Sequence, residues 1–185
     1  MDADIERLRR TLAPARPDPP IPPGVPAGVL VPLVDLPDPF LVFTKRSDGV
    51  RDHKGEISFP GGVRHAEDVD LVATALRETQ EELGIPADAI EVLGSLPPTH
   101  TMVTGYVIVP FVGVLAEPPT YLPSPHEIDE VLEFQVHRLV SAEREVTTGE
   151  VEEPHRMYAY EMDGYVVWGA TGRVLHSFLE ALKEG

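Results

Sequence analysis

The chain has 185 residues, no cysteine and a formal net charge of -16 at pH 7. This length suits one domain with a well-buried core. Without cysteine, disulfides, thiolate metal sites and a cysteine nucleophile are excluded, so any metal would be held by oxygen or imidazole. The negative charge argues against broad binding to nucleic acid, which depends on Lys and Arg neutralising phosphates.

The sequence also argues against a membrane protein. No apolar run approaches the roughly 20 residues that a membrane-spanning helix requires. The N-terminus is acidic, whereas a signal peptide begins with basic residues. We therefore expect a cytoplasmic protein, and the sequence leaves its oligomeric state open.

The first third of the chain predicts a short helix over residues 2–12 and an extended, proline-rich arm over residues 13–28. We accordingly divide the chain into an N-terminal helix and arm, residues 1–28, and a folded domain, residues 29–185. Two strands are expected at residues 29–34 and 40–44, with turn residues between them. Pro32 places the first strand toward a sheet edge, and a polar loop follows over residues 45–58.

A helix over residues 69–83 carries an unusual cluster of acidic side chains. Glu78, Glu81 and Glu82 have the spacing i, i+3 and i+4, which places them on one face. Gly84 predicts the end of the helix, so Glu81 and Glu82 lie at the negative end of its dipole, which disfavours each by roughly 0.3–1 kcal/mol. Arg77 supplies one positive charge, and hard cations such as Mg²⁺ or Mn²⁺ would supply the rest through oxygen ligands.

The second half of the chain alternates strands with one further helix. The pattern predicts strands at residues 90–96, 106–116 and 131–136, a hairpin of residues 158–162 and 165–168 around Asp163 and Gly164, and a helix at residues 170–183. Together these elements predict an α/β fold with a mixed sheet covered on both faces. Trp168 and Tyr165 are expected in the core rather than stacked on a nucleobase. The seven histidines lack the i, i+4 spacing of a zinc helix and are expected to be structural or on the surface.

The acidic helix and the loop before it resemble the Nudix box, G-x5-E-x7-R-E-U-x-E-E-x-G-U with U apolar. The second half fits at Arg77, Glu78, Glu81, Glu82, Gly84 and Ile85. The first half departs from the pattern, because Asp68 replaces the first glutamate and eight residues rather than seven separate it from Arg77. An extra residue inside a helix would rotate the preceding side chains by about 100°, so we place it in the loop or the first turn. Asp68 then either takes the part of the first glutamate or caps the helix.

A second, overlapping signature is similar to one found in the coenzyme A pyrophosphatase branch of this family. Arg51, Gly55 and Phe59-Pro60-Gly61-Gly62 stand at its spacing, and weaker similarity continues at Trp168-Gly169-Ala170-Thr171. The resemblance implies a Nudix-type α/β/α sandwich with a mixed β-sheet. It also implies Mg²⁺- or Mn²⁺-dependent hydrolysis of coenzyme A or its acyl derivatives to 3′,5′-ADP and 4′-phosphopantetheine.

The resemblance further implies roles for individual residues. The metal ligands would be Glu78, Glu81, Glu82 and the carbonyl of Gly61, and Arg77 would orient a glutamate through an ion pair. The general base would be a glutamate of the box or of a later loop, where we favour Glu127 over Glu130; either could instead complete a metal site.

Substrate contacts are expected from a second group of residues. A guanidinium fork matches phosphate oxygens, and Arg51, Arg46 and Lys54 are the basic residues nearest to the signature. Gly62 allows close approach of the backbone, and Thr104 could shape a substrate loop. Two alternatives stay open: hydrolysis of another nucleoside diphosphate derivative, such as ADP-ribose, a dinucleotide or an oxidised nucleotide, or a metal- or nucleotide-binding domain without catalysis.

Overall fold

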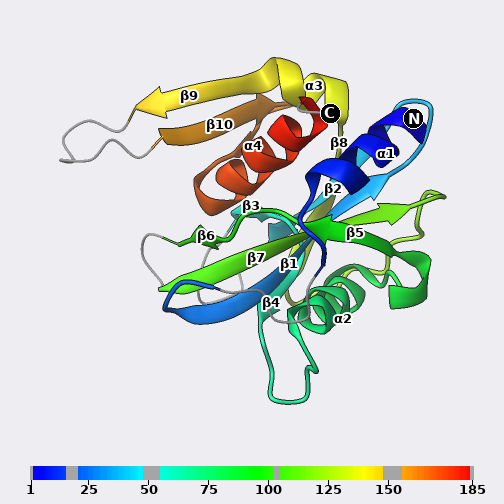
Figure 1. Ribbon diagram of the computed structural model, residues 1–185, viewed down its shortest axis with the longest axis vertical. Coiled ribbons are helices and arrows are strands. Elements are labelled where there is room, and N and C mark those ends of the chain that lie inside the picture. The colour runs from blue at the N-terminus through cyan, green and yellow to red at the C-terminus, as the bar shows by residue number, and fades with distance from the viewer. Residues whose placement is uncertain (1, 16–20, 48–54, 102–104, 148–155, 184–185) are drawn as a thin grey trace.

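A computed structural model describes residues 2–15, 21–47, 55–101, 105–147 and 156–183. An eight-stranded mixed sheet has α2 on one face and α1 and α4 on the other, and a three-stranded sheet lies beside α4 (Figure 1). The elements are, in chain order, α1 (Asp2–Thr11), β1 (Val25–Val34), β2 (Phe40–Arg46), β3 (Ile57–Ser58), β4 (Gly61–Val63), α2 (Leu71–Leu83), the 3₁₀ turn η1 (Ala87–Ala89), β5 (Glu91–Ser95), β6 (Thr99–His100), β7 (Tyr106–Leu115), β8 (Ile128–Gln135), α3 (Val136–Ala142), β9 (Glu143–Thr147), β10 (Arg156–Met162), β11 (Tyr165–Val167) and α4 (Gly169–Lys183).

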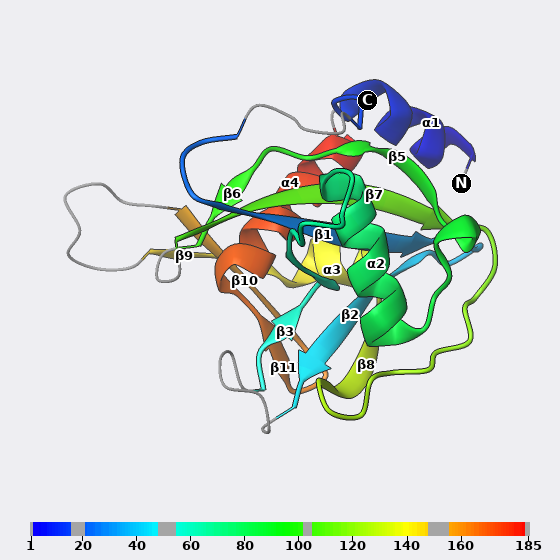
Figure 2. The same ribbon diagram turned by 90° about the horizontal axis from the view of Figure 1, so that it is seen from below.

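The large sheet confirms the expected mixed α/β architecture. Its main path runs β3-β2-β1-β7-β5, with β4 paired to β1, β6 to β7 and β8 to β2. The long strands β1 and β7 are parallel over their whole length, and the other pairs are antiparallel. Figure 2 shows α2 crossing in front of β1 and β7.

The prediction that Pro32 marks an edge strand is wrong, because β1 lies in the middle of the sheet. On the side opposite β7, β1 pairs with β4 at residues 27–29 and with β2 at residues 33 and 34. Leu30 donates its amide to Pro60 on that side, and alternate residues of a strand direct their amides to the same side. An amide at position 32 would therefore point to the place where β1 changes its partner from β4 to β2. The proline consequently removes no hydrogen bond from the sheet.

Each face of the large sheet has its own apolar core. The α2 core contains Leu30, Val34, Val42, Leu71, Ala75, Leu83, Val109 and Phe111. The opposite core is built by α1, α4 and the small sheet and contains Leu8, Phe43, Phe59, Val112, Leu139, Tyr160, Val174 and Phe178. The two cores hold α2 and α4 at fixed places on opposite faces of one sheet.

The predicted boundaries hold for most elements. The expected arm is shorter than predicted, since β1 begins at Val25 and pairs with β7 from that residue. The hairpin is confirmed, with Asp163 and Gly164 at φ angles of 52° and 84°, but it belongs to a separate sheet completed by β9. Among the described residues, no helix has the length and apolar character to cross a membrane.

Candidate active site

Helix α2 begins and ends as its sequence directs. Asp70 caps the N-terminus by accepting a hydrogen bond from the amide of Ala73 at 2.7 Å, and Gly84 ends the helix at a φ of 73°. Two carbonyls of the last turn accept amides from a later loop, Glu82 from Ser124 and Leu83 from Leu122. The acidic end of the helix is therefore tied to the loop that leads into β8.

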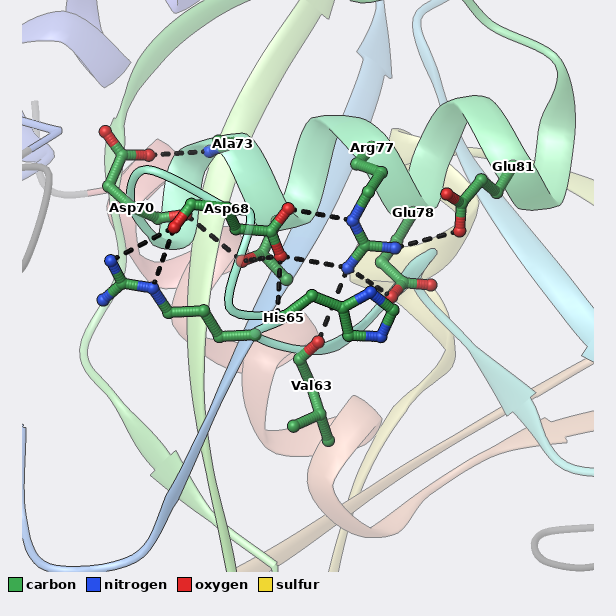
Figure 3. A network of polar contacts seen from close by, with 10 residues as sticks. Val63, His65, Asp68, Asp70, Ala73, Arg77, Glu78 and Glu81 are labelled. Carbon is green, nitrogen blue, oxygen red and sulfur yellow. Dashed lines mark hydrogen bonds and ion pairs between the residues drawn. The ribbon is translucent and has the colours of Figure 1, made fainter.

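Arg77 is the centre of the polar network on this helix (Figure 3). Its Nε lies 2.9 Å from Oδ1 of Asp68 and its Nη2 3.1 Å from Oδ2. Its other ion pairs are with Glu78 Oε1 and Glu81 Oε2, each at 2.9 Å, and Nη2 also donates to the carbonyl of Val63 at 3.5 Å. One guanidinium thus binds three carboxylates, two of them in its own helix.

Asp68 is a buried anchor for Arg77 rather than a helix cap, which is the part that Asp70 takes. Its carboxylate also accepts the amide of His65 and the hydroxyl of Thr74, both at 2.9 Å. The hydrogen bond from Arg77 is the main reason why the pKa of Asp68 lies well below its usual range. Because α2 starts at Leu71, the additional residue between Asp68 and Arg77 lies in the loop and leaves the acidic face of the helix in register.

Glu82 is the buried carboxylate of the cluster, with 3% of its surface exposed. Its Oε2 accepts the amide of Gly61 at 3.3 Å, and Oε1 lies 3.8 Å from Nη1 of Arg46. Burial raises the pKa of Glu82 to about 8, and the negative charges of Glu78 and Glu127 act in the same direction. Arg46 and the Gly61 amide therefore do not fully compensate the negative charge of the site.

Two glycines bring the backbone against this helix. A Cβ on Gly62 would lie 2.6 Å from Oε1 of Glu78, and a Cβ on Gly28 would lie 2.3 Å from the carbonyl of Leu71. Both distances are shorter than a side chain tolerates. Gly28 lets α2 pack directly on β1, and Gly62 lets β4 lie next to the carboxylate of Glu78.

A pocket of about 200 Å³ opens beside Glu82 on the other side of β4. It contains two of the predicted substrate residues, Arg46 and Gly62, whereas the predicted contacts Arg51, Lys54 and Thr104 lie outside the described residues. Its lining is Ala27, Val29, Arg46, Glu56, Ser58, Phe59, Gly61, Gly62, Val63, Thr101, Tyr106, Ile108, Ala170 and Thr171. No pattern in the sequence predicts that α4 contributes to this pocket, although Ala170 and Thr171 belong to a segment that resembles the coenzyme A branch.

The two candidate bases of the later loop differ in their surroundings. Glu127 is exposed and close enough to Glu82 to raise its pKa. Glu130 accepts the hydroxyl of Tyr165 at 2.8 Å and lies 3.6 Å from Lys45. Trp168 is 53% exposed, so the expectation that it belongs to the core is wrong.

The carboxylates of this site are the type of ligand that a hard divalent cation prefers. All are oxygen donors, and a buried carboxylate with a raised pKa lacks the positive charge that a cation would bring. In the part of the chain that the structure describes, no three acidic or histidine side chains converge as a preformed metal cluster. Arg77 binds Glu78 and Glu81, and the Glu81 side chain is 55% exposed, so it is free to turn toward a cation.

Comparison with known proteins identifies the family of this chain. A family model described as the NUDIX domain matches residues 24–156. The chain belongs to the Nudix family. Two relatives, each named uncharacterized Nudix hydrolase NudL, come from Photorhabdus laumondii (33% identity, 85% of this chain and 84% of the relative) and Pectobacterium atrosepticum (36%, 81% and 79%).

Solved structures match at lower identity and support the fold. The Nudix hydrolase RenU from M. smegmatis has a TM-score of 0.53 at 18% identity, covering 63% of this chain and 74% of its own. A MutT protein from Methanosarcina mazei Go1 has a TM-score of 0.55 at 15% identity, covering 87% and 94%. As a Nudix hydrolase, the protein acts on the phosphorus anhydride of a diphosphate substrate, and enzymes of this family generally use divalent metal ions such as Mg²⁺.

Proposed function

We propose that this Nudix hydrolase cleaves the diphosphate of coenzyme A or an acyl derivative, giving 3′,5′-ADP and 4′-phosphopantetheine. The supporting observation is the second signature, Arg51, Gly55 and Phe59-Pro60-Gly61-Gly62, which resembles that of the coenzyme A branch. Three residues of this signature, Phe59, Gly61 and Gly62, line the pocket beside Glu82. A small-molecule substrate and a cytoplasmic setting are part of this proposal.

Mg²⁺ or Mn²⁺ would be held by Glu78, Glu81, Glu82 and the carbonyl of Gly61. When bound, the cation neutralises phosphate oxygens and lowers the pKa of water. Arg77 positions Glu78 and Glu81 from the side of the helix, since its guanidinium binds both.

The remaining roles fall to residues around the pocket. Glu127 would accept the proton of the attacking water, because it is exposed and its negative charge acts on Glu82. Arg46, Gly62 and Thr104, with Arg51 and Lys54, would bind the substrate. Arg46 lines the pocket, and its Nε is buried and finds no hydrogen-bond partner among the described residues.

The test is product analysis by chromatography after incubation with Mg²⁺ and either coenzyme A or ADP-ribose. We expect 3′,5′-ADP from coenzyme A, and no product with a Glu82→Gln variant. Cleavage of ADP-ribose alone would keep the hydrolase chemistry and remove the coenzyme A assignment. Binding of coenzyme A without cleavage would indicate a domain that has lost catalysis.

A further inference from the structure

Arg173 on α4 is a partly buried arginine without a carboxylate partner. Its Nη2 donates a hydrogen bond to the carbonyl of His100 in β6. No carboxylate lies within ion-pair distance of it in the residues that the structure describes, and burial alone lowers the pKa of its guanidinium. A charge removed from water without a counter-charge is unfavourable, so this arrangement needs an explanation.

Three other partly buried arginines lie within ion-pair distance of a carboxylate. Arg7 pairs with Asp4 at 3.3 Å, Arg46 faces Glu82 at 3.8 Å, and Arg77 binds Asp68 at 2.9 Å. The chain has 31 acidic and 15 basic residues, so counter-charges are abundant. That Arg173 has no carboxylate partner among the described residues is therefore not a consequence of composition, and it leaves most of its five N–H donors for a ligand.

The position of Arg173 connects it to the pocket beside Glu82. Ala170 and Thr171, which line that pocket, precede Arg173 on α4 by less than one turn. In the chain, His100 precedes Thr101, which also lines the pocket. The hydrogen bond from Arg173 to His100 thus links α4 to the β6 segment beside the pocket.

The pocket is also small for the substrates of a diphosphate hydrolase. Its volume of about 200 Å³ is below the roughly 300–1,000 Å³ of pockets that enclose a drug-sized ligand. Arg46 serves the part of the pocket next to Glu82. A substrate group some distance from the scissile bond would therefore lie along α4 and β6, where Arg173 has no carboxylate partner among the described residues.

We propose that Arg173 is a specificity residue that binds a phosphate monoester of the substrate outside the scissile diphosphate. A guanidinium presents parallel N–H groups that match phosphate oxygens, which suits this anion better than a point charge would. This inference rests on the proposed function, because in coenzyme A the group concerned is the 3′-phosphate of the ribose. Arg173 would thus contribute a substrate contact from the C-terminal helix, in addition to those of the basic residues near the signature.

The direct test measures binding of 3′,5′-ADP and of 5′-AMP by calorimetry, since neither ligand contains the diphosphate and the two differ by the 3′-phosphate. Arg173→Gln should weaken 3′,5′-ADP binding about tenfold or more, as expected for a lost charge-assisted hydrogen bond, and leave AMP binding unchanged. Arg173→Lys, which keeps the charge without the fork, should lose less. Arg138→Gln is the matched control, because Arg138 is exposed and paired with Asp163 at 2.7 Å.

Turnover gives the second readout. With Arg173→Gln, KM should rise about tenfold for coenzyme A and stay unchanged for 3′-dephospho-coenzyme A. Equal losses for both members of either ligand pair, or no loss for either, would overturn the proposal. If the wild-type protein leaves coenzyme A intact but binds 3′,5′-ADP in a manner that depends on Arg173, the proposed function fails and the anion site stands. Thermal unfolding identifies a misfolded glutamine variant, in which case the lysine variant decides by the same ligand comparison.

Discussion

Replacing Asp68 with Asn removes the carboxylate that anchors Arg77 and should reduce both stability and activity. The substitution keeps the size of the side chain, but its amide group faces the guanidinium with a donor where Arg77 needs an acceptor. Removing one partner of a buried ion pair costs about 3–5 kcal/mol. The Asp68 side chain is 5% exposed, whereas Arg77 is 23% exposed and keeps Glu78 and Glu81. We therefore expect the lower end of that range, about 3 kcal/mol.

The assay is urea unfolding in EDTA, followed by kinetics with Mg²⁺. The folded-state pKa of Asp68 is lowered, so its contribution to stability is present above the ordinary pKa of about 4 and is lost as the pH falls through the lowered value. The difference between the wild type and Asp68→Asn should thus stay constant from pH 5 to 8 and decrease only below about pH 4. A tenfold or larger loss of kcat/KM is expected with it, at about 1.4 kcal/mol per factor of ten.

Asp70→Asn is the matched control, because it removes the same charge two residues away. Asn caps helices about as well as Asp, so this variant should unfold within about 0.5 kcal/mol of the wild type. If Asp68→Asn were as stable as Asp70→Asn, the ion pair with Arg77 would contribute nothing to the folded state, and the role given to Asp68 would be refuted.

Three further predictions concern the site itself. The pKa of Glu82 is raised to about 8, so the folded carboxyl retains a proton that the unfolded one releases. In EDTA, the free energy of unfolding should therefore fall as the pH rises from about 4.5 to 8. A Glu82→Gln variant measured in the same way should show a flatter dependence of this free energy on pH. In urea, Gly62→Ala should be within about 1 kcal/mol of the wild type in stability, because the Glu78 carboxylate can move away from the new methyl group. The kcat of this variant should nevertheless fall at least about tenfold. An unchanged kcat would show that catalysis does not need the Glu78 carboxylate at this position. Glu127→Gln should lower kcat by about 100-fold without a change in thermal stability, since the side chain is exposed, whereas unaltered kinetics would assign the base to another glutamate.

The acidic helix was predictable from the sequence because its signals are local. Gly84 and the spacing of Glu78, Glu81 and Glu82 act within a few residues of one another, and the helix ends where expected. Its start was less well predicted, because the cap is Asp70 and the first helical residue is Leu71. Pro32 was misread for the opposite reason. Pro32 is tolerated because β1 pairs with β4 before it and with β2 after it. No pattern within β1 indicates which strands will flank this strand.

The part of the site contributed by α4 was also beyond local reasoning. Arg173 meets His100 across 73 residues of sequence, and this contact depends on the packing of α4 on the face opposite α2. The acidic composition of the chain does not indicate which arginine lacks a carboxylate partner. That property of Arg173 is visible only in the folded arrangement.

Asp68 gains a further role once the charges of α2 are considered together. Arg77 is shared by Asp68, Glu78 and Glu81, while Glu82 stays buried beside them with a raised pKa. A divalent cation would compete with Arg77 for Glu78 and Glu81. If the cation bound both carboxylates, Arg77 would stay ordered only if another carboxylate held its guanidinium in place. Asp68 is that carboxylate, since it approaches from the loop and not from the helix. We therefore expect Asp68→Asn to reduce the rise in melting temperature that Mg²⁺ produces, in addition to its effect in EDTA. An undiminished Mg²⁺ effect would mean that Arg77 and the cation do not share ligands.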